Sequence, residues 1–161
     1  ANIGFHKAIK ENGGRTEITA VGDRYVLENM LANGYNLGGE QSGHIIFTDF
    51  STTGDGPVTA LQVLSYLKRT RHKASAITKI MTSYPQLLVN VKVATKDGWE
   101  DNEAIKASIE EGKQQLGENG RILVRPSGTE PLIRVMAEGP DQKELEEICY
   151  KIADVVKAQQ G

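Results

Sequence analysis

The hydrophobic pattern of the chain changes at Ser83-Tyr84-Pro85. Before this point, apolar residues at helical spacing alternate with short extended segments, which is typical of an α/β domain. After it, the order of patterns is strand, helix, strand, strand, helix, which suits one antiparallel sheet covered on one face by two helices. The residue before a proline is restricted to extended conformations, so Tyr84-Pro85 indicates a linker. The sequence therefore predicts an α/β domain in residues 1–82 followed by an α+β domain in residues 83–161.

The first part is expected to contain three helices and two short strands. Asp23 and Asp55 are suited to cap helices, and Pro57 fits a first helical turn. The expected helices are residues 2–11, residues 23–33 and the segment after Asp55, where Leu61, Leu64 and Leu67 recur at helical spacing. The expected strands are residues 17–21 and 44–47.

The second part begins with an alternating strand at residues 86–95, and RILVRP and PLIRVMAEG are two further strand candidates around a short SGTE turn. Asp101 and Asp141 are expected to cap two amphipathic helices. In the second of these helices, Cys149 follows Ile148 among core positions, which favours a buried thiol over a reactive one.

Composition limits the class of partner. The chain has 161 residues, of which 25% are charged, and a formal net charge of −2. Strong attraction to nucleic acid or to an anionic membrane is therefore not expected. No apolar run is long enough to cross a bilayer, and the first residues lack the apolar core of a secretory signal. We expect a cytoplasmic protein whose partners are small molecules or parts of its own assembly.

Residues 38–44, GGEQSGH, combine three glycines with a carboxylate, an amide, a hydroxyl and an imidazole. Glycine allows positive φ and lets a ligand approach the main chain, so these glycines suggest a turn shaped around a ligand. Glu40 can accept hydrogen bonds from neighbouring sugar hydroxyls, and Ser42 can donate or accept. A tight connection with a capping serine and a solvated glutamate is the simpler interpretation, and the residues alone favour it.

Residues 125–131, RPSGTEP, place two hydroxyls and a glycine between two prolines, directly after Arg125. A stiffened turn of this kind can aim backbone N–H groups, Ser127 and Thr129 at one point, which suits an anion. The guanidinium of Arg125 matches phosphate oxygens with two parallel donors, and Arg134 on the following strand can add a second cation. A hairpin turn of ordinary turn residues explains the same stretch equally well.

Two other polar groups carry weaker signals. The one histidine and one carboxylate of GGEQSGH leave the other ligands of a metal ion unaccounted for, so no metal site is expected. The basic run at residues 68–73, KRTRHK, can contact a polynucleotide. Cations near a helix C-terminus also complement the helix dipole, however, and a solvated surface is the favoured interpretation.

Taken together, the two loops resemble a known family. GGEQSGH followed by HIIF, and RPSGTEPLIRVMAEG, are similar to the sugar-recognition and phosphate-binding loops of the α-D-phosphohexomutase superfamily, and VGDRYV and TGDG occur at similar relative positions. The resemblance runs along the whole chain. It implies an incomplete α/β/α third domain in residues 1–82 and a complete fourth domain in residues 83–161, with a fold like that of the TATA-box-binding protein.

The resemblance also implies what the chain lacks. Family members carry a phosphorylated serine in one earlier motif and closely spaced aspartates that bind Mg²⁺ in another, and neither motif occurs in this sequence. The chain is thus expected to be a C-terminal fragment of an isomerase, inactive alone, with the N-terminal domains of the same polypeptide as partners. Mg²⁺ would bind outside this chain, and a sugar bisphosphate would act as intermediate and activator. The oligomeric state stays open, with a homodimer as one option.

By the same resemblance, the intact enzyme interconverts glucosamine 6-phosphate and glucosamine 1-phosphate through a phosphoserine, for peptidoglycan precursor synthesis. Gln41 favours this amino-sugar substrate. Mannose or glucose phosphates are the alternatives within the superfamily, and a non-catalytic sugar-phosphate binding module is the alternative outside it.

The residues that match family positions divide into two groups. One group serves the sugar hydroxyls and the other the phosphate that is not transferred: Glu40 and Ser42, then Arg125, Ser127, Gly128 and Thr129, with Arg134 beside them. His44 lies near the sugar by analogy, where it either assists proton transfer or makes a structural hydrogen bond at the start of a strand.

Overall fold

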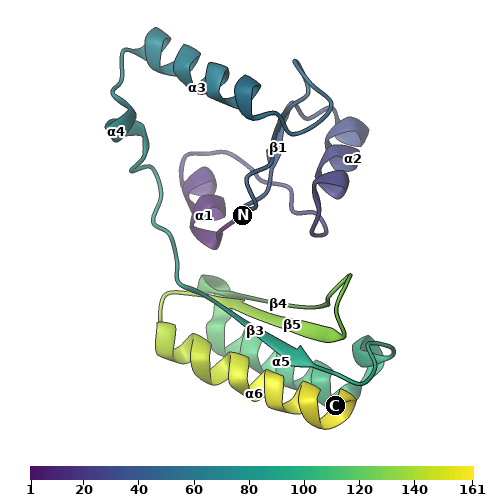
Figure 1. Ribbon diagram of the computed structural model, residues 1–161. Helices are drawn as coiled ribbons and strands as arrows, with labels where there is room; N and C mark the ends of the chain where they lie inside the picture. Colours follow the sequence, from purple (N-terminus) through teal and green to yellow (C-terminus); the bar gives the residue numbers. More distant parts are fainter. The chain divides into compact units, whose positions relative to one another are not determined.

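The computed structural model describes residues 1–161, which form two compact units, unit 1 of residues 1–82 and unit 2 of residues 83–161. In unit 1 the helices are α1 (Ile3–Glu11), α2 (Asp23–Asn33), α3 (Gly56–Thr70) and α4 (Ala74–Ile77), and the strands are β1 (Leu37–Gly39) and β2 (Ile45–Phe47) (Figure 1). No helix in the chain combines the length and the apolar character that crossing a membrane requires.

Capping explains how the helices of unit 1 begin. The Asp55 carboxylate accepts a hydrogen bond from the backbone N–H of Val58 at 2.9 Å, which confirms the predicted cap of α3. The prediction that Asp23 caps α2 is wrong, because Gly22 occupies the cap position with a φ of 134°. Asp23 is the first helical residue instead, where its negative charge is favourable at the positive end of the helix dipole.

The expected strand at residues 17–21 does not form, and this segment is irregular. A strand persists only where its backbone N–H and C=O groups find partners in a neighbouring strand. The two-stranded sheet of unit 1 pairs β1 only with β2. The apolar side chains that suggested the strand, Ile18 and Val21, are 69% and 50% exposed. Local pattern therefore misled the prediction because no strand lies beside this segment.

The buried core of unit 1 is small. Ile3, Met30 and Ile46 are its buried apolar side chains, whereas α3 buries none of its residues. The antiparallel hairpin of β1 and β2 packs against α2, since a side chain at Gly38 would collide with the sulfur of Met30. The GGEQSGH turn is thus carried by a short hairpin with one helix behind it.

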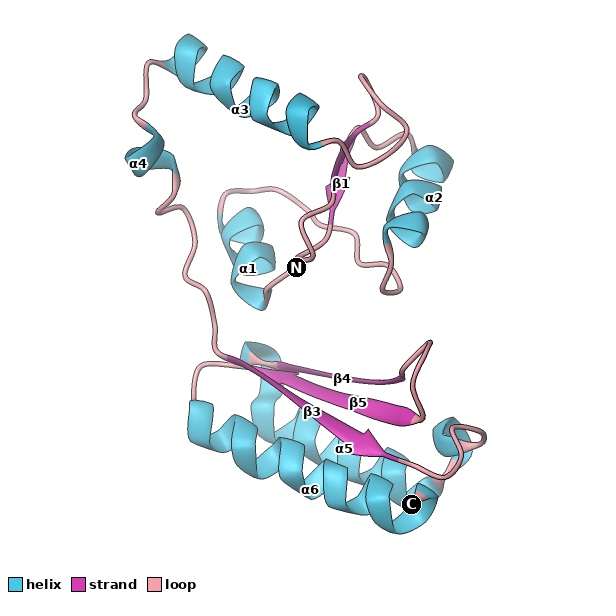
Figure 2. Cartoon of the chain, in the orientation of Figure 1, coloured by secondary structure: helices cyan, strands magenta, loops and turns pink.

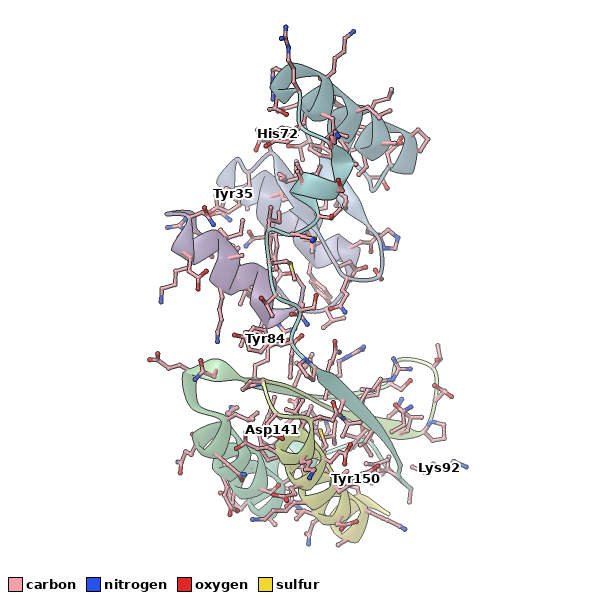
Figure 3. The ribbon with its side chains drawn as sticks, turned by 90° about the vertical axis from the view of Figure 1, so that its left-hand side faces the viewer. Tyr35, His72, Tyr84, Lys92, Asp141 and Tyr150 are labelled. Carbon is pink, nitrogen blue, oxygen red and sulfur yellow. The ribbon has the colours of Figure 1, made fainter.

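Unit 2 is an antiparallel sheet with helices on one face. Its strands are β3 (Gln86–Lys92), β4 (Arg121–Pro126) and β5 (Leu132–Glu138), arranged in the order β3-β5-β4. The helices α5 (Glu103–Leu116) and α6 (Gln142–Gln160) lie side by side under the sheet, as Figure 2 shows. Two short 3₁₀ helices flank α5, at Trp99–Asp101 and Gly117–Asn119. The predicted α+β architecture is confirmed.

One helix start in unit 2 differs from the prediction. Asp101 does not cap α5, because it ends the 3₁₀ helix that precedes it. Asn102 is the cap, and its side-chain oxygen accepts hydrogen bonds from the backbone N–H groups of Ala104 and Ile105 at 3.0 and 3.1 Å. Asp141 caps α6 as predicted. The tight turn at Trp99 therefore moves the helix start by one residue.

Alternate residues of the sheet face the helices and form the core of unit 2. Strand residues such as Val91, Ile133 and Val135 pack with side chains from α5 and α6, namely Ile105, Leu116, Leu145, Ile148, Cys149, Ile152 and Val156. Cys149 is fully buried, which confirms its predicted core position, and this burial raises the pKa of its thiol to about 11. The strand residues between the core positions project from the other face of the sheet.

Candidate functional site

The GGEQSGH turn is closed by backbone hydrogen bonds. The N–H of Glu40 donates to the carbonyl oxygen of His44 at 2.9 Å, and the N–H of Gly43 donates to the carbonyl oxygen of Glu40 at 3.2 Å. The pairing of Gly39 with Ile45 sets this register at the end of the hairpin. The turn therefore presents the side chains of Glu40, Ser42 and His44 together.

These three side chains form one hydrogen-bonded cluster. The Ser42 hydroxyl donates to Glu40 Oε1 at 2.6 Å, and its oxygen lies 3.0 Å from His44 Nδ1. His44 Nδ1 also lies 3.1 Å from Glu40 Oε1, and the Glu40 side chain is 22% exposed. The second carboxylate oxygen of Glu40 is in none of these contacts, so it can accept hydrogen bonds from a ligand hydroxyl.

The glycines of this turn have structural reasons of their own. A side chain at Gly38 would collide with Met30, and at Gly39 a Cβ would lie 2.6 Å from the carbonyl oxygen of His44. Gly43 has a φ of 101°, which other residues rarely adopt. Packing and backbone conformation therefore account for all three glycines, and their number is not itself a sign of a ligand.

The RPSGTEP loop joins β4 to β5 and leaves several donors free. The Ser127 N–H donates to the carbonyl oxygen of Leu132 at 2.9 Å, and the buried Ser127 hydroxyl accepts a hydrogen bond from the N–H of Glu130 at 3.3 Å. The backbone N–H groups of Gly128 and Thr129 make no hydrogen bond, and both residues are exposed. The tip of the loop therefore offers adjacent N–H donors to solvent.

Strand pairing places two arginines face to face beside this loop. Arg125 on β4 lies directly opposite Arg134 on β5, on the face of the sheet that the helices do not cover. Arg134 reaches Glu130 at 3.3 Å and the Ser127 hydroxyl at 3.4 Å, but its Nε is buried without a hydrogen-bond partner. The side chain of Arg125 is half-buried and makes neither a hydrogen bond nor an ion pair. Like charges directly opposite one another are destabilising, so this pair favours a bound anion.

The structure thus gathers the predicted residues in two places. Glu40, Ser42 and His44 share the turn in unit 1, and Arg125, Ser127, Gly128, Thr129 and Arg134 share one hairpin in unit 2. Sequence reasoning did not predict that the two arginines are cross-strand partners. The short turn between two expected strands was the available signal, because hairpin register follows from loop length.

The residues of the chain do not fit a Mg²⁺ site. No three His, Cys, Asp or Glu side chains lie close enough together to hold a metal ion. The cluster of Glu40 and His44 supplies one carboxylate and one imidazole, whereas Mg²⁺ prefers oxygen ligands in an octahedral arrangement. Glu40 and His44 therefore do not make up a Mg²⁺ site.

Gly128 provides a test of the free N–H donors at the loop tip. A Cβ there would meet no atom within 4 Å, and its φ is not positive, so neither packing nor strain requires glycine. We expect Gly128→Ala to leave the Tm unchanged while weakening the binding of inorganic phosphate roughly tenfold, because the methyl group would keep the anion from the backbone. Calorimetry measures both quantities.

Gly43→Ala is the matched control for this substitution. Its positive φ makes alanine strained, so the Tm should fall while phosphate affinity stays the same. Equal phosphate affinities for Gly128→Ala and the unchanged chain would show that the anion does not approach the loop tip.

Two family models match the chain. The model described as "Phosphoglucomutase/phosphomannomutase, alpha/beta/alpha domain III" matches residues 1–84, and the model described as "Phosphoglucomutase/phosphomannomutase, C-terminal domain" matches residues 88–155. Together they include both loops described above.

The most similar curated proteins that we report are named phosphoglucosamine mutase. A phosphoglucosamine mutase of Brevibacillus brevis is 55% identical over 159 residues, 99% of this chain and 36% of that protein. The chain spans about a third of the length of the curated relatives it matches, 36% in each of the first two.

Solved structures are similar in fold. The N-acetylphosphoglucosamine mutase of Aspergillus fumigatus has a TM-score of 0.81 at 20% identity, covering 99% of this chain and 37% of that one. A structure of the same fungal enzyme in complex with GlcNAc-6P and magnesium has a TM-score of 0.57 at 25% identity, covering 68% of this chain and 22% of that one.

Proposed function

The chain belongs to the phosphoglucomutase/phosphomannomutase family, and we propose that it is the substrate-recognition part of a phosphoglucosamine mutase. The reaction would interconvert glucosamine 6-phosphate and glucosamine 1-phosphate. In this proposal the serine that carries the phosphate, and the Mg²⁺ that assists its transfer, belong to parts of the enzyme outside these residues. The chain contributes the recognition of the phosphate and of the sugar hydroxyls.

The pair of opposed arginines carries the proposal. The side chain of Arg125 is half-buried and makes no hydrogen bond or ion pair. It lies opposite Arg134, whose Nε is also without a hydrogen bond. A phosphate dianion would supply acceptors for both guanidinium groups and for the N–H donors of Gly128 and Thr129. A mutase that moves one phosphate needs a rigid holder for the other, and this hairpin has the charge and the donors for that role.

The turn at Glu40 suits the second requirement of such a reaction. A bisphosphate intermediate must be bound in two orientations so that either phosphate can be transferred. Turning the sugar end for end approximately exchanges its 3- and 4-hydroxyls. A carboxylate that accepts a hydrogen bond from both hydroxyls therefore serves either orientation. The free oxygen of Glu40 and the adjacent Ser42 hydroxyl provide these contacts in the proposal.

Substrate choice tests the proposal in a complete enzyme. In a chimera, this chain would replace the equivalent 159 residues of the Brevibacillus brevis phosphoglucosamine mutase. We expect kcat/KM for glucosamine phosphate to exceed that for mannose and glucose phosphates by about 100-fold, because a polar site discriminates strongly against ligands that leave its groups unpaired.

Two outcomes of this comparison would contradict the proposal. Equal or higher activity on a mannose or glucose phosphate would identify another mutase of the family. Binding of sugar phosphate without turnover would indicate a non-catalytic binding module.

A further inference from the structure

Lys96 reaches the RPSGTEP loop from an earlier part of the chain. Its Nζ donates a hydrogen bond to the carbonyl oxygen of Ser127 at 2.8 Å, across a separation of 31 residues. The same segment is tied to the far end of the loop, where the N–H of Val93 donates to the carbonyl oxygen of Pro131 at 3.1 Å. Two hydrogen bonds therefore hold the segment that follows β3 against this loop.

The ammonium of Lys96 has donors to spare. An ammonium carries three N–H donors, and the carbonyl oxygen of Ser127 accepts from one of them. Lys96 is half-buried, and no carboxylate lies within ion-pair distance of it. A partly buried charge without a counter-ion is unfavourable, because it loses hydration that nothing replaces. An anion bound beside the loop would supply the missing counter-ion.

Ser127 links Lys96 to the arginine pair. Lys96 approaches its carbonyl oxygen, while Arg134 Nη2 lies 3.4 Å from its hydroxyl oxygen. Ser127 itself is 2% exposed, so the two cations contact different atoms of one buried residue. Lys96 and the two arginines are positively charged, and among these groups the exposed Glu130, which pairs with Arg134, carries the negative charge. Positive charge at the loop therefore exceeds negative charge.

We propose that Lys96 is a third cation of the phosphate site, beside Arg125 and Arg134. Its bond to Ser127 holds the loop in shape, and its remaining donors bind a phosphate oxygen. This assignment rests on the proposed function, because it adds a residue to the same phosphate site. Nothing in the local sequence around Lys96 indicates this role. It is inferred from the hydrogen bond between Lys96 and Ser127, which are distant in the sequence.

Two substitutions separate the charge of Lys96 from its hydrogen bond. Lys96→Gln keeps an N–H donor for the Ser127 carbonyl but removes the charge, whereas Lys96→Arg keeps the charge. We expect Lys96→Gln to raise the Kd of the 161-residue chain for glucosamine 6-phosphate about tenfold, and Lys96→Arg to stay within about threefold. Isothermal titration calorimetry gives both values.

The dependence of Kd on ionic strength is a second measurement, and Lys96→Gln would leave it unchanged if Lys96 had only a structural role. If Lys96 contacts the phosphate, Lys96→Gln should also weaken the dependence of Kd on ionic strength, because one charge fewer meets the anion. Lys143→Gln is the control, since this exposed lysine lies at the start of α6, at the opposite end of β5 from the loop. It should alter neither Kd nor salt dependence.

The outcomes separate this inference from the proposed function. Unchanged affinity and salt dependence in Lys96→Gln, in a chain whose phosphate binding is lost in Arg125→Ala, would overturn the role of Lys96 alone. Equal losses of affinity in Lys96→Gln and Lys96→Arg would show that the positive charge does not contribute to binding, and would overturn it too. Failure of the unchanged chain to bind glucosamine 6-phosphate would remove both proposals.

Discussion

Replacing Arg125 by alanine is expected to raise the Kd of the chain for glucosamine 6-phosphate by about 100-fold, because a bidentate arginine contributes two charge-assisted hydrogen bonds to phosphate. The side chain of Arg125 makes no hydrogen bond or ion pair in the protein, so its removal breaks no polar interaction. The Tm should stay the same or rise slightly, because Arg134 loses a like charge directly opposite. Calorimetric titration and thermal unfolding measure the two effects.

The conservative variant shows whether geometry or charge alone matters at this position. Arg125→Lys keeps one positive charge but loses the planar pair of donors, so we expect an intermediate Kd, about tenfold above that of the unchanged chain. Arg24→Ala removes an exposed arginine that pairs with Glu28 on α2, and it should leave phosphate binding unchanged. A Kd for Arg125→Ala equal to that of the unchanged chain would mean that the phosphate is held elsewhere.

Replacing Glu40 by glutamine in the chimeric enzyme is expected to lower kcat/KM by about 100-fold in both directions of the reaction. The carboxylate can accept a hydrogen bond from each of two sugar hydroxyls, whereas an amide presents one acceptor and one donor group. Because either orientation of the sugar would use the same carboxylate, the forward and reverse reactions should suffer alike. Initial rates with glucosamine 6-phosphate and with glucosamine 1-phosphate give the two values.

Two controls accompany the Glu40 variant. Glu28→Gln changes an exposed carboxylate on α2 of the same unit and should leave the rates unchanged. Thermal unfolding checks that replacing the carboxylate acceptor of the Ser42 hydroxyl by a neutral amide oxygen has not disordered the turn. A loss confined to one direction of the reaction would contradict the idea that Glu40 serves both orientations.

Local sequence predicted the features that depend on local interactions. The caps at Asp55 and Asp141 form as expected because an aspartate can satisfy the free N–H groups of the helix it precedes. The cap predicted at Asp101 moved by one residue because the preceding chain forms a 3₁₀ turn that sequence pattern does not reveal. The strand expected at residues 17–21 depended on a neighbouring strand, which no local pattern can supply.

The candidate site also has a part that local sequence predicts and a part that depends on contacts between distant segments. Glu40, Ser42 and His44 lie within five residues, so their cluster follows from one short turn. The opposition of Arg125 and Arg134 requires the register of two strands, and the contact of Lys96 with Ser127 spans 31 residues. Residue types and spacing therefore indicated the chemistry of each loop. The unpaired charges that argue for an anion became visible only with the pairing of the strands.

Nuclear magnetic resonance titration of the 161-residue chain with glucosamine 6-phosphate tests the central claim most directly, because backbone amide shifts report on each loop separately. We expect the largest shifts at the amides of Gly128 and Thr129, smaller shifts at Lys96, and a second group of shifts in the turn of Glu40 and Ser42. Inorganic phosphate should reproduce the first group and not the second. Saturable shifts elsewhere, with the amides of Arg125 and residues 127–130 unmoved, would contradict the account.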